Sequence, residues 1–282
     1  MRAEVISIET PAEPLDGLFY LPEDRKPAAA ALIFHGNCCN FYTGPPRFLP
    51  EALVPRGIAC LAFNRRGHDM ITSAGGRGGA ARYASGGSFQ FNSEGIEDNR
   101  LASDWLASRG FKNPIVIGHS NGGMLAAKHC ADNYGSPRAL VLLSAHGGGV
   151  HLAERMNGAG LFARDRQAEL TAQAETMVVQ GKGRELMLLP GWWWAISAES
   201  FLDRTRNTPD TVECAAKICC PSLFLRGSKE DPVSYPAEAF AANAAAPCEV
   251  RIIPDGDHWY TGHENETAVI VADWLEKHCK LG

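Results

Sequence analysis

Long apolar runs are missing from this 282-residue sequence, although 45% of its residues are hydrophobic. Its apolar stretches have the length of β-strands, far short of the about 20 residues that cross a bilayer. Residues 1–9 alternate between polar and apolar side chains and contain no apolar core of a signal peptide, so they predict a strand. We therefore expect a cytoplasmic protein without a membrane span.

An excess of charge of one sign is also missing. The chain has 27 Lys and Arg residues against 32 Asp and Glu residues, for a formal net charge of -5. Such a balance provides no basic field for nucleic acid. We expect a small-molecule substrate and no nucleic-acid partner, and the oligomeric state stays open, with a homodimer among the options.

Cysteines are present, but not in patterns that hold metals or disulfide frameworks. There are nine, an odd number, and none forms a CxxC pair. The neighbours Cys38-Cys39 and Cys219-Cys220 are poorly placed for a disulfide framework, so free thiols in a reducing compartment are the simpler interpretation. We expect neither a metal nor another cofactor.

The order of the segments predicts the fold class. Short apolar runs alternate with helical patterns, which favours right-handed βαβ units, a mostly parallel central sheet and helices on both faces, an α/β fold. A hairpin of residues 3–8 and 18–21 opens the chain. Buried strands are predicted at 30–34, 58–63, 114–118, 139–144, 222–226 and 249–253, and helices at 47–56, 93–109, 121–134, 236–245 and 265–279.

Two stretches interrupt this alternation. Residues 147–217 read as helices and loops, with a helical pattern over 161–180, and we interpret them as a helical lid inserted into a core of residues 1–146 and 218–282. Residues 75–87 carry six glycines without a fixed period, which is typical of a mobile or a functional loop.

The pentapeptide Gly118-His119-Ser120-Asn121-Gly122 matches the G-x-S-x-G pattern of a nucleophile elbow. A buried strand leads into it and a helix leaves it, which is the context that the pattern needs. The glycines allow a turn so tight that the serine hydroxyl stands clear of the sheet. Ser120 is therefore the candidate nucleophile.

A serine hydroxyl needs a base to accept its proton, and the base needs a carboxylate to orient it. His258 follows the last predicted strand, at the sheet edge where ligands bind in α/β folds. Its competitor His263 stands at the entrance of the last helix. For the carboxylate we favour Asp231, in a turn after the strand that ends at Arg226, and its neighbour Glu230 stays open.

The oxyanion of an acyl-transfer reaction needs backbone N–H donors. The loop after the first buried strand begins with His35-Gly36, and the glycine lets the backbone approach a substrate closely. We assign the two donors to Asn37 and Asn121. Cys38 stands beside them, either as a small space-filling side chain or as part of a substrate pocket.

Taken together, His35-Gly36, Asn64-Arg65-Arg66-Gly67-His68, the elbow, Asp231 and His258 resemble the α/β-hydrolase superfamily, esterase-like and with a lid insertion. The resemblance covers nearly the whole chain outside residues 147–217. It implies that Arg65, Arg66 and His68 brace the floor of the site. Two features depart from the usual pattern: Asn121 follows the serine, and the acid loop holds one extra residue.

These residues predict a serine hydrolase that forms an acyl-enzyme, most simply a carboxylesterase acting on a small to medium apolar or aromatic ester. The same residues could cleave a C–C bond in a ring-cleavage diketone or an amide, and the chain could also be a ligand-binding receptor without turnover. Candidate pocket residues are Cys38, Trp192, Trp193, Trp194 and Trp259, with Phe162, Leu188 and Leu189 as further apolar candidates in the lid, although most of the lid residues could simply seal it against the core.

Overall fold

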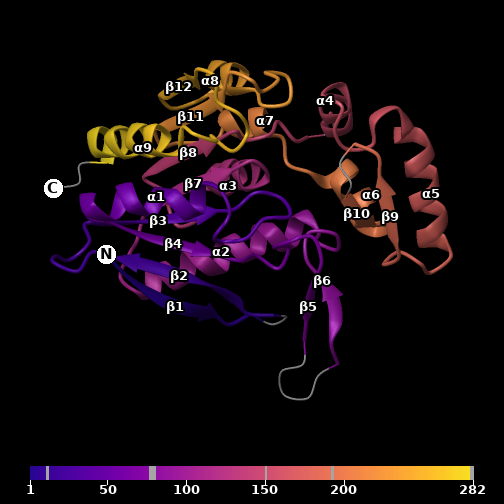
Figure 1. Ribbon diagram of the computed structural model, residues 1–282, viewed down its shortest axis with the longest axis horizontal. Helices are drawn as coiled ribbons and strands as arrows, with labels where there is room; N and C mark the ends of the chain where they lie inside the picture. The colour runs from indigo at the N-terminus through magenta and orange to yellow at the C-terminus, as the bar shows by residue number, and fades with distance from the viewer. Residues whose placement is uncertain (11–12, 76–80, 150, 192–193, 280–282) are drawn as a thin grey trace.

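An eight-stranded sheet forms the centre of the molecule (Figure 1). The structure is a computed structural model and describes residues 1–10, 13–75, 81–149, 151–191 and 194–279. The strand order is β1-β2-β4-β3-β7-β8-β11-β12. β2 pairs antiparallel with β1 and β4, and the six strands from β4 to β12 run parallel. The predicted α/β class with a mostly parallel sheet is confirmed.

The strands of this sheet agree with the apolar runs of the sequence. The opening hairpin pairs β1 with β2 in the register Arg2↔Leu21 to Ile8↔Leu15. The strands are β1 (Arg2–Ile8), β2 (Leu15–Leu21), β3 (Ala29–Phe34), β4 (Ile58–Phe63), β7 (Ile115–His119), β8 (Ala139–Leu143), β11 (Ser222–Gly227) and β12 (Cys248–Ile253). β3, β4, β7, β8 and β11 are buried along their whole length, because helices cover both faces.

Two layers of helices enclose the sheet. One face is covered by α1 (Pro45–Leu53), which continues into the short 3-10 helix η1 (Val54–Arg56), and by α9 (Glu264–Cys279). The other face is covered by α2 (Asn92–Ser108), α3 (Asn121–Ala131), α7 (Thr211–Ala215) and α8 (Ala237–Asn243). Alternate residues of one strand therefore enter different cores.

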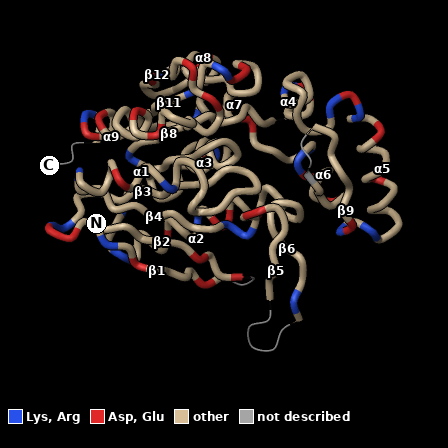
Figure 2. Tube along the Cα trace, viewed as in Figure 1, with Lys and Arg blue, Asp and Glu red and all other residues tan. Residues whose placement is uncertain are grey.

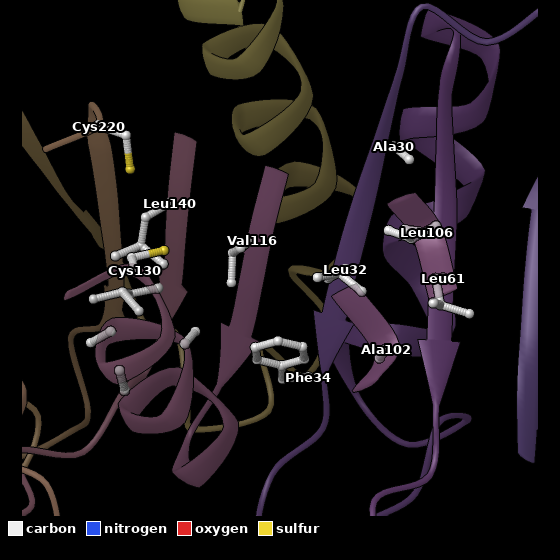
Figure 3. Close-up of a cluster of buried hydrophobic side chains, with 14 of the residues drawn as sticks. Ala30, Leu32, Phe34, Leu61, Ala102, Leu106, Val116, Cys130, Leu140 and Cys220 are labelled. Atoms are coloured by element: carbon white, nitrogen blue, oxygen red, sulfur yellow. The ribbon is translucent and has the colours of Figure 1, made fainter. Parts of the chain in front are cut away.

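Strand β3 shows this alternation. Leu32 and Phe34 point to the layer of α2 and α3, whereas Ile33 points to the layer of α1 and α9. Figure 3 shows the core on the side of α2 and α3, where Val116 of β7 lies between Leu140 of β8 and Leu32 of β3. Because apolar side chains fill both faces, the carboxyl ends of the parallel strands are held in a fixed arrangement.

Residues 147–217 lie between β8 and β11, and much of this segment forms a separate group at one side of the sheet (Figure 1). It contains α4 (Leu152–Gly158), the 3-10 helix η3 (Arg164–Arg166), α5 (Gln167–Val179), α6 (Ala198–Asn207), α7 and two strands that the sequence analysis did not predict, β9 (Leu186–Leu189) and β10 (Trp194–Ser197). Its own apolar cluster extends from Leu152 to Leu202. We call residues 152–208 the lid segment, because Cys214 and Ala215 of α7 pack into the sheet core instead.

Two short strands pair antiparallel next to and within the glycine-rich residues 75–87 and project from the molecule (Figure 1). They are β5 (Thr72–Ala74) and β6 (Tyr83–Ser85). Charged residues of both signs are spread along the outer helices and loops (Figure 2). Within the described residues, each helix is too short or too polar to cross a membrane.

Candidate active site

Ser120 stands on a sharp turn between β7 and α3. Its backbone has φ 55° and ψ -120°, a left-handed conformation that an L-residue adopts only where its surroundings impose it. The flanking glycines show how tight the packing is: a Cβ on Gly118 would lie 2.3 Å from the carbonyl oxygen of Gly122, and one on Gly122 would lie 2.3 Å from that of His35. The elbow geometry predicted for Ser120 is therefore present.

His258 follows β12 and is held by a carboxylate from the loop after β11. Its Nδ1 lies 2.7 Å from Oε1 of Glu230, whose side chain is almost fully buried. A carboxylate only accepts hydrogen bonds, so Nδ1 carries the proton and Nε2 is left as the basic nitrogen of a neutral ring. A half-buried imidazole that is oriented in this way can act as a base.

The second oxygen of Glu230 is fixed as well. Oε2 accepts the backbone N–H of Gly227 at 2.8 Å and the hydroxyl of Ser144 at 2.6 Å. Ser144 in turn lies 2.8 Å from the hydroxyl of Tyr260, which is 3.1 Å from the carbonyl oxygen of Leu225. Ser144 and Tyr260 have one hydroxyl proton each for these three hydroxyl contacts, and we assign the proton of Ser144 to Glu230. Each oxygen of the Glu230 carboxylate then accepts at least one hydrogen bond.

The preference for Asp231 as the carboxylate beside His258 was wrong. Asp231 turns its side chain back to its own loop, where Oδ2 accepts the backbone N–H of Ser234 at 2.9 Å and its hydroxyl at 2.7 Å. Burial raises the pKa of Asp231, but the hydrogen bonds from Ser234 and from the N–H of Val233 outweigh it and lower the pKa. Glu230, the alternative that the sequence left open, is the carboxylate that faces His258.

His119, the last residue of β7, anchors the loop that carries His258. Its Nε2 lies 2.8 Å from the backbone carbonyl of His258 and therefore donates to it, and the two rings are 4.8 Å apart. Burial, together with the neighbouring His258, lowers the pKa of His119 to about 3. His119 is thus neutral and ties the elbow to the histidine loop.

Hydrogen bonds from Arg65 hold the loop after β3 in place. Arg65 is fully buried and donates from Nη2 to the carbonyl of His35 at 2.6 Å, and its backbone N–H donates to Nε2 of His35 at 3.2 Å. The backbone N–H of Arg66 donates to Asp98 at 2.8 Å. A Cβ on Gly36 would lie 3.3 Å from the Cβ of Ser120, so this loop passes directly beside the serine.

A pocket opens beside Ser120, with a cavity volume of about 40 Å³. The carboxyl ends of the sheet strands contribute four of the lining residues, and the lid segment contributes five. The lining residues are Asn37, Ser120, Asn121 and His146 from the core, and Leu152, Met156, Phe162, Arg204 and Thr208 from the lid segment. Both asparagines expected to donate to an oxyanion therefore line the same pocket as Ser120.

A comparison of the sequence with models of known protein families identifies the family. Residues 31–272 match the model of the alpha/beta hydrolase family. The chain belongs to this family. No curated protein sequence is similar enough to count as a match.

Solved structures of other α/β hydrolases have the same fold. Est1E from Butyrivibrio proteoclasticus is 16% identical, with a TM-score of 0.68 over 98% of this chain and 99% of that chain. A thermostable carboxyl esterase from Bacillus coagulans is 14% identical, with a TM-score of 0.70 over 99% of each chain. At such identities the likeness shows the fold alone.

The expected pocket of this α/β hydrolase differs from the observed one. Phe162 lines it, but Leu188 is exposed and Leu189 packs inside the lid segment. Trp192 and Trp193 lie outside the described residues, as does the side chain of Trp194. Trp259 is 40% exposed and lies against the rings of His119 and His258, outside the described lining of the pocket.

Cys38 is half-buried and packs against the apolar cluster of the lid segment rather than lining the pocket. Burial raises the pKa of its thiol to about 11, so the thiol stays protonated at neutral pH. Across the described residues, no three His, Cys, Asp or Glu side chains gather in a group that could hold a metal ion.

Five lining residues were missed: His146, Leu152, Met156, Arg204 and Thr208. His146 follows β8 at the same sheet edge as Ser120 and His258, so its position after an apolar run was a usable signal. The other four gave no such signal, because they belong to the lid segment, whose folding the strand pattern does not predict.

Proposed function

We propose that the protein hydrolyses carboxylic esters, with Ser120 as nucleophile, His258 as base and Glu230 as the carboxylate that orients it. The contact of 2.7 Å between Glu230 and Nδ1 of His258 carries this proposal, because it leaves Nε2 free to take a proton. Membership in the α/β-hydrolase family supports it, as do the esterases among the structures with the same fold.

In the first half of the reaction, Ser120 Oγ attacks the ester carbonyl carbon and passes its proton to Nε2 of His258. The C–O bond to the alcohol then breaks, and His258 gives the proton to the departing alcohol. Water adds to the acyl-enzyme in the same way, so that acid and free Ser120 are released. Glu230 stays ionised throughout and stabilises the imidazolium.

The negative charge on the former carbonyl oxygen is met by the backbone N–H groups of Asn37 and Asn121. Asn121 is the first residue of α3, where N–H groups have no partner inside the helix and the helix dipole favours negative charge. Asn37 lies in the loop after β3, which Arg65 holds through the carbonyl of His35. Two such donors contribute a factor of about 10² to 10³ each.

The lid segment provides the other wall of the pocket. Leu152 and Met156 of α4 and the ring of Phe162 form an apolar surface that faces the Ser120 side. The ring of Phe162 stacks on Phe201 at 5.3 Å, so α6 supports it from behind. We propose that this segment selects the acyl group while the sheet core performs the chemistry.

Labelling with a fluorophosphonate tests the nucleophile, and substrate panels test the bond. The wild type should be labelled and should hydrolyse 4-nitrophenyl esters of short acids, while Ser120→Ala should lose labelling and about 10⁵-fold or more of its activity. A 4-nitroanilide and a ring-cleavage diketone run beside the esters. Faster turnover of either would reject ester hydrolysis, and equal labelling of Ser120→Ala would reject Ser120.

A further inference from the structure

Phe162 has an unusual backbone conformation in the wall of the pocket that holds Ser120. Its φ is 56°, in the left-handed region that bulky side chains rarely adopt. The residue is buried, and it lines the pocket together with Leu152 and Met156 of α4. Because a left-handed backbone costs free energy outside glycine, the surrounding chain must impose it on Phe162.

Two neighbouring parts of the lid segment hold the backbone at Phe162. The backbone N–H of Gly191 donates to the carbonyl of Phe162 at 2.8 Å. A Cβ on Gly191 would lie 2.3 Å from the backbone nitrogen of Phe162, so the two stretches of chain are in direct contact. The backbone N–H of Ala163 donates to Oδ1 of Asn157 at 2.9 Å, which ties this turn to the last turn of α4. The position of Phe162 is therefore fixed by contacts on each side of the turn.

The ring of Phe162 is supported from behind by α6. It stacks on the ring of Phe201, with the centroids 5.3 Å apart and the planes at 5° to each other. Phe201 is fully buried and belongs to the same apolar cluster of the lid segment as Phe162. Because Phe201 occupies the space on that side, the ring of Phe162 cannot move toward α6 to make room for a larger substrate.

The position of His258 shows which half of an ester this pocket holds. The departing alcohol must lie next to Nε2 of His258 to receive its proton. The described lining contains Ser120 and the two asparagines assigned to the oxyanion, but not His258, so the pocket holds the acyl half. Its volume is about 40 Å³, and a water-sized group takes about 10–15 Å³ of such a volume. The pocket therefore has room for about three carbon atoms beyond the carbonyl.

We propose that Phe162 sets the length of the acyl group, so that the substrates are esters of short aliphatic acids with up to about four carbons. Leu152 and Met156 contact the methylene groups of such an acid, and a longer chain would collide with the ring of Phe162, which Phe201 holds in place. This inference rests on the proposed ester hydrolysis and adds a substrate class to it.

A series of 4-nitrophenyl esters tests the length limit. The acetate, butanoate, hexanoate and octanoate share one leaving group, so their kcat/KM values differ through the acyl group alone. From butanoate to hexanoate the wild type should lose at least about tenfold in kcat/KM, because methylene groups that a pocket cannot accommodate cost at least that much. A wild type without this loss overturns the inference but leaves ester hydrolysis standing. Hydrolysis of none of the esters rejects the proposed function and this inference with it.

Variants at position 162 test whether the ring of Phe162 sets the limit. Phe162→Ala should raise the ratio of kcat/KM for hexanoate to that for butanoate by at least about tenfold. Phe162→Gly should raise it as well, and its backbone adopts a φ of 56° without strain, which protects the test against poor folding of the alanine variant. Phe162→Leu keeps part of the apolar volume, and its ratio should fall between those of the wild type and Phe162→Ala.

Leu170→Ala is the matched control for a weakened lid. Leu170 is buried in the same apolar cluster as Phe162 but lies outside the described lining of the pocket. The variant should be less stable than the wild type in thermal unfolding, and its ratio of hexanoate to butanoate should equal that of the wild type. If Leu170→Ala raises the ratio as much as Phe162→Ala does, or if the variants at position 162 slow all esters by one factor, Phe162 only supports the lid and the inference is wrong.

Discussion

Ser120 and Arg204 line one pocket, yet they come from regions built in different ways. Ser120 follows β7, whose five residues are all buried between two helical layers. Arg204 comes from the lid segment, where α5 buries just Leu170 and Ala174 of its thirteen residues. The sheet core fixes its side chains by packing on every side, whereas the lid segment depends on one small apolar cluster and on contacts to the core.

The contacts between the two regions are polar as well as apolar. The carboxylate of Asp203 in α6 accepts the backbone N–H of Asn92 at 2.7 Å and its side-chain amide at 2.9 Å. The hydroxyl of Ser88 donates to the carbonyl of Ala195 in β10. Hydrogen bonds thus join the lid segment to the chain at residues 88–92, outside the apolar core of the sheet.

The largest expected effect lies in the core, at the carboxylate beside His258. Glu230→Gln should lower kcat by about 10³ to 10⁴ for every ester, because an amide no longer fixes the protonated Nδ1. The matched variant Asp231→Asn should change kcat by less than about threefold, since Asp231 bonds to Ser234. Steady-state kinetics on a 4-nitrophenyl ester measures both. A larger loss of kcat in Asp231→Asn than in Glu230→Gln would show that Asp231 is the carboxylate that assists His258.

A methyl group on the elbow should have the next largest effect. In Gly122→Ala the new Cβ would collide with the carbonyl oxygens of Phe34 and His35, at 2.3 to 2.4 Å, and backbone cannot move aside easily. We expect a loss of about 3 kcal/mol in the free energy of unfolding, together with lower activity. Urea denaturation followed by circular dichroism provides the value. Wild-type stability would show that the turn is looser than the structure indicates.

Acid should weaken the core through its buried histidines. Burial, with a further contribution from Arg100, lowers the pKa of His129 in α3 from 6.5 to about 4, so the unfolded chain binds a proton that the folded chain does not. This contribution to stability is complete above pH 6.5 and is lost as the pH falls toward 4. At pH 5 the loss is about 2 kcal/mol.

The variant His129→Gln isolates that contribution. The difference between its unfolding free energies at pH 7 and pH 5 should be about 2 kcal/mol smaller than the same difference in the wild type. Urea titrations at the two pH values measure it. An equal difference in both proteins would mean that protonation of His129 does not lower the free energy of unfolding.

The smallest effect is expected in the lid segment. Gly158 ends α4, and a Cβ there would meet no heavy atom within 4 Å, in contrast to Gly122. Gly158→Ala should therefore stabilise the protein by about 0.5 to 1 kcal/mol, because alanine loses less backbone entropy in a helix. Thermal unfolding would detect this gain. Destabilisation instead would place the end of α4 under constraints like those of the core.

Much of the core was predictable because its signals are local. The apolar runs at 30–34 and 58–63 correspond to β3 and β4, and the five residues from Gly118 to Gly122 predicted the turn that Ser120 occupies. The position of His258 followed from the strand before it. The β9-β10 hairpin was missed because its strands have four residues each, although Pro190-Gly191 after β9 was a usable turn signal.

The choice between two neighbouring carboxylates needed the tertiary structure. Glu230 and Asp231 differ by one position and one methylene group, and nothing near them in the sequence tells which of them faces a histidine 28 residues later. The path of the loop after β11 decided it, turning Glu230 toward His258 and Asp231 toward Ser234. The place of Arg204 in the pocket was even harder to predict, because it lies 84 positions after Ser120 in the sequence.

By itself, the sequence determined the α/β fold and the turn that carries Ser120, because hydrophobic periodicity and glycine sterics act over a few residues. The tertiary structure alone decided the partner of His258 and the place of Arg204 in the pocket. Those features depend on where distant segments meet, and their meeting is set by the packing of whole helices and strands, which no short stretch of sequence records.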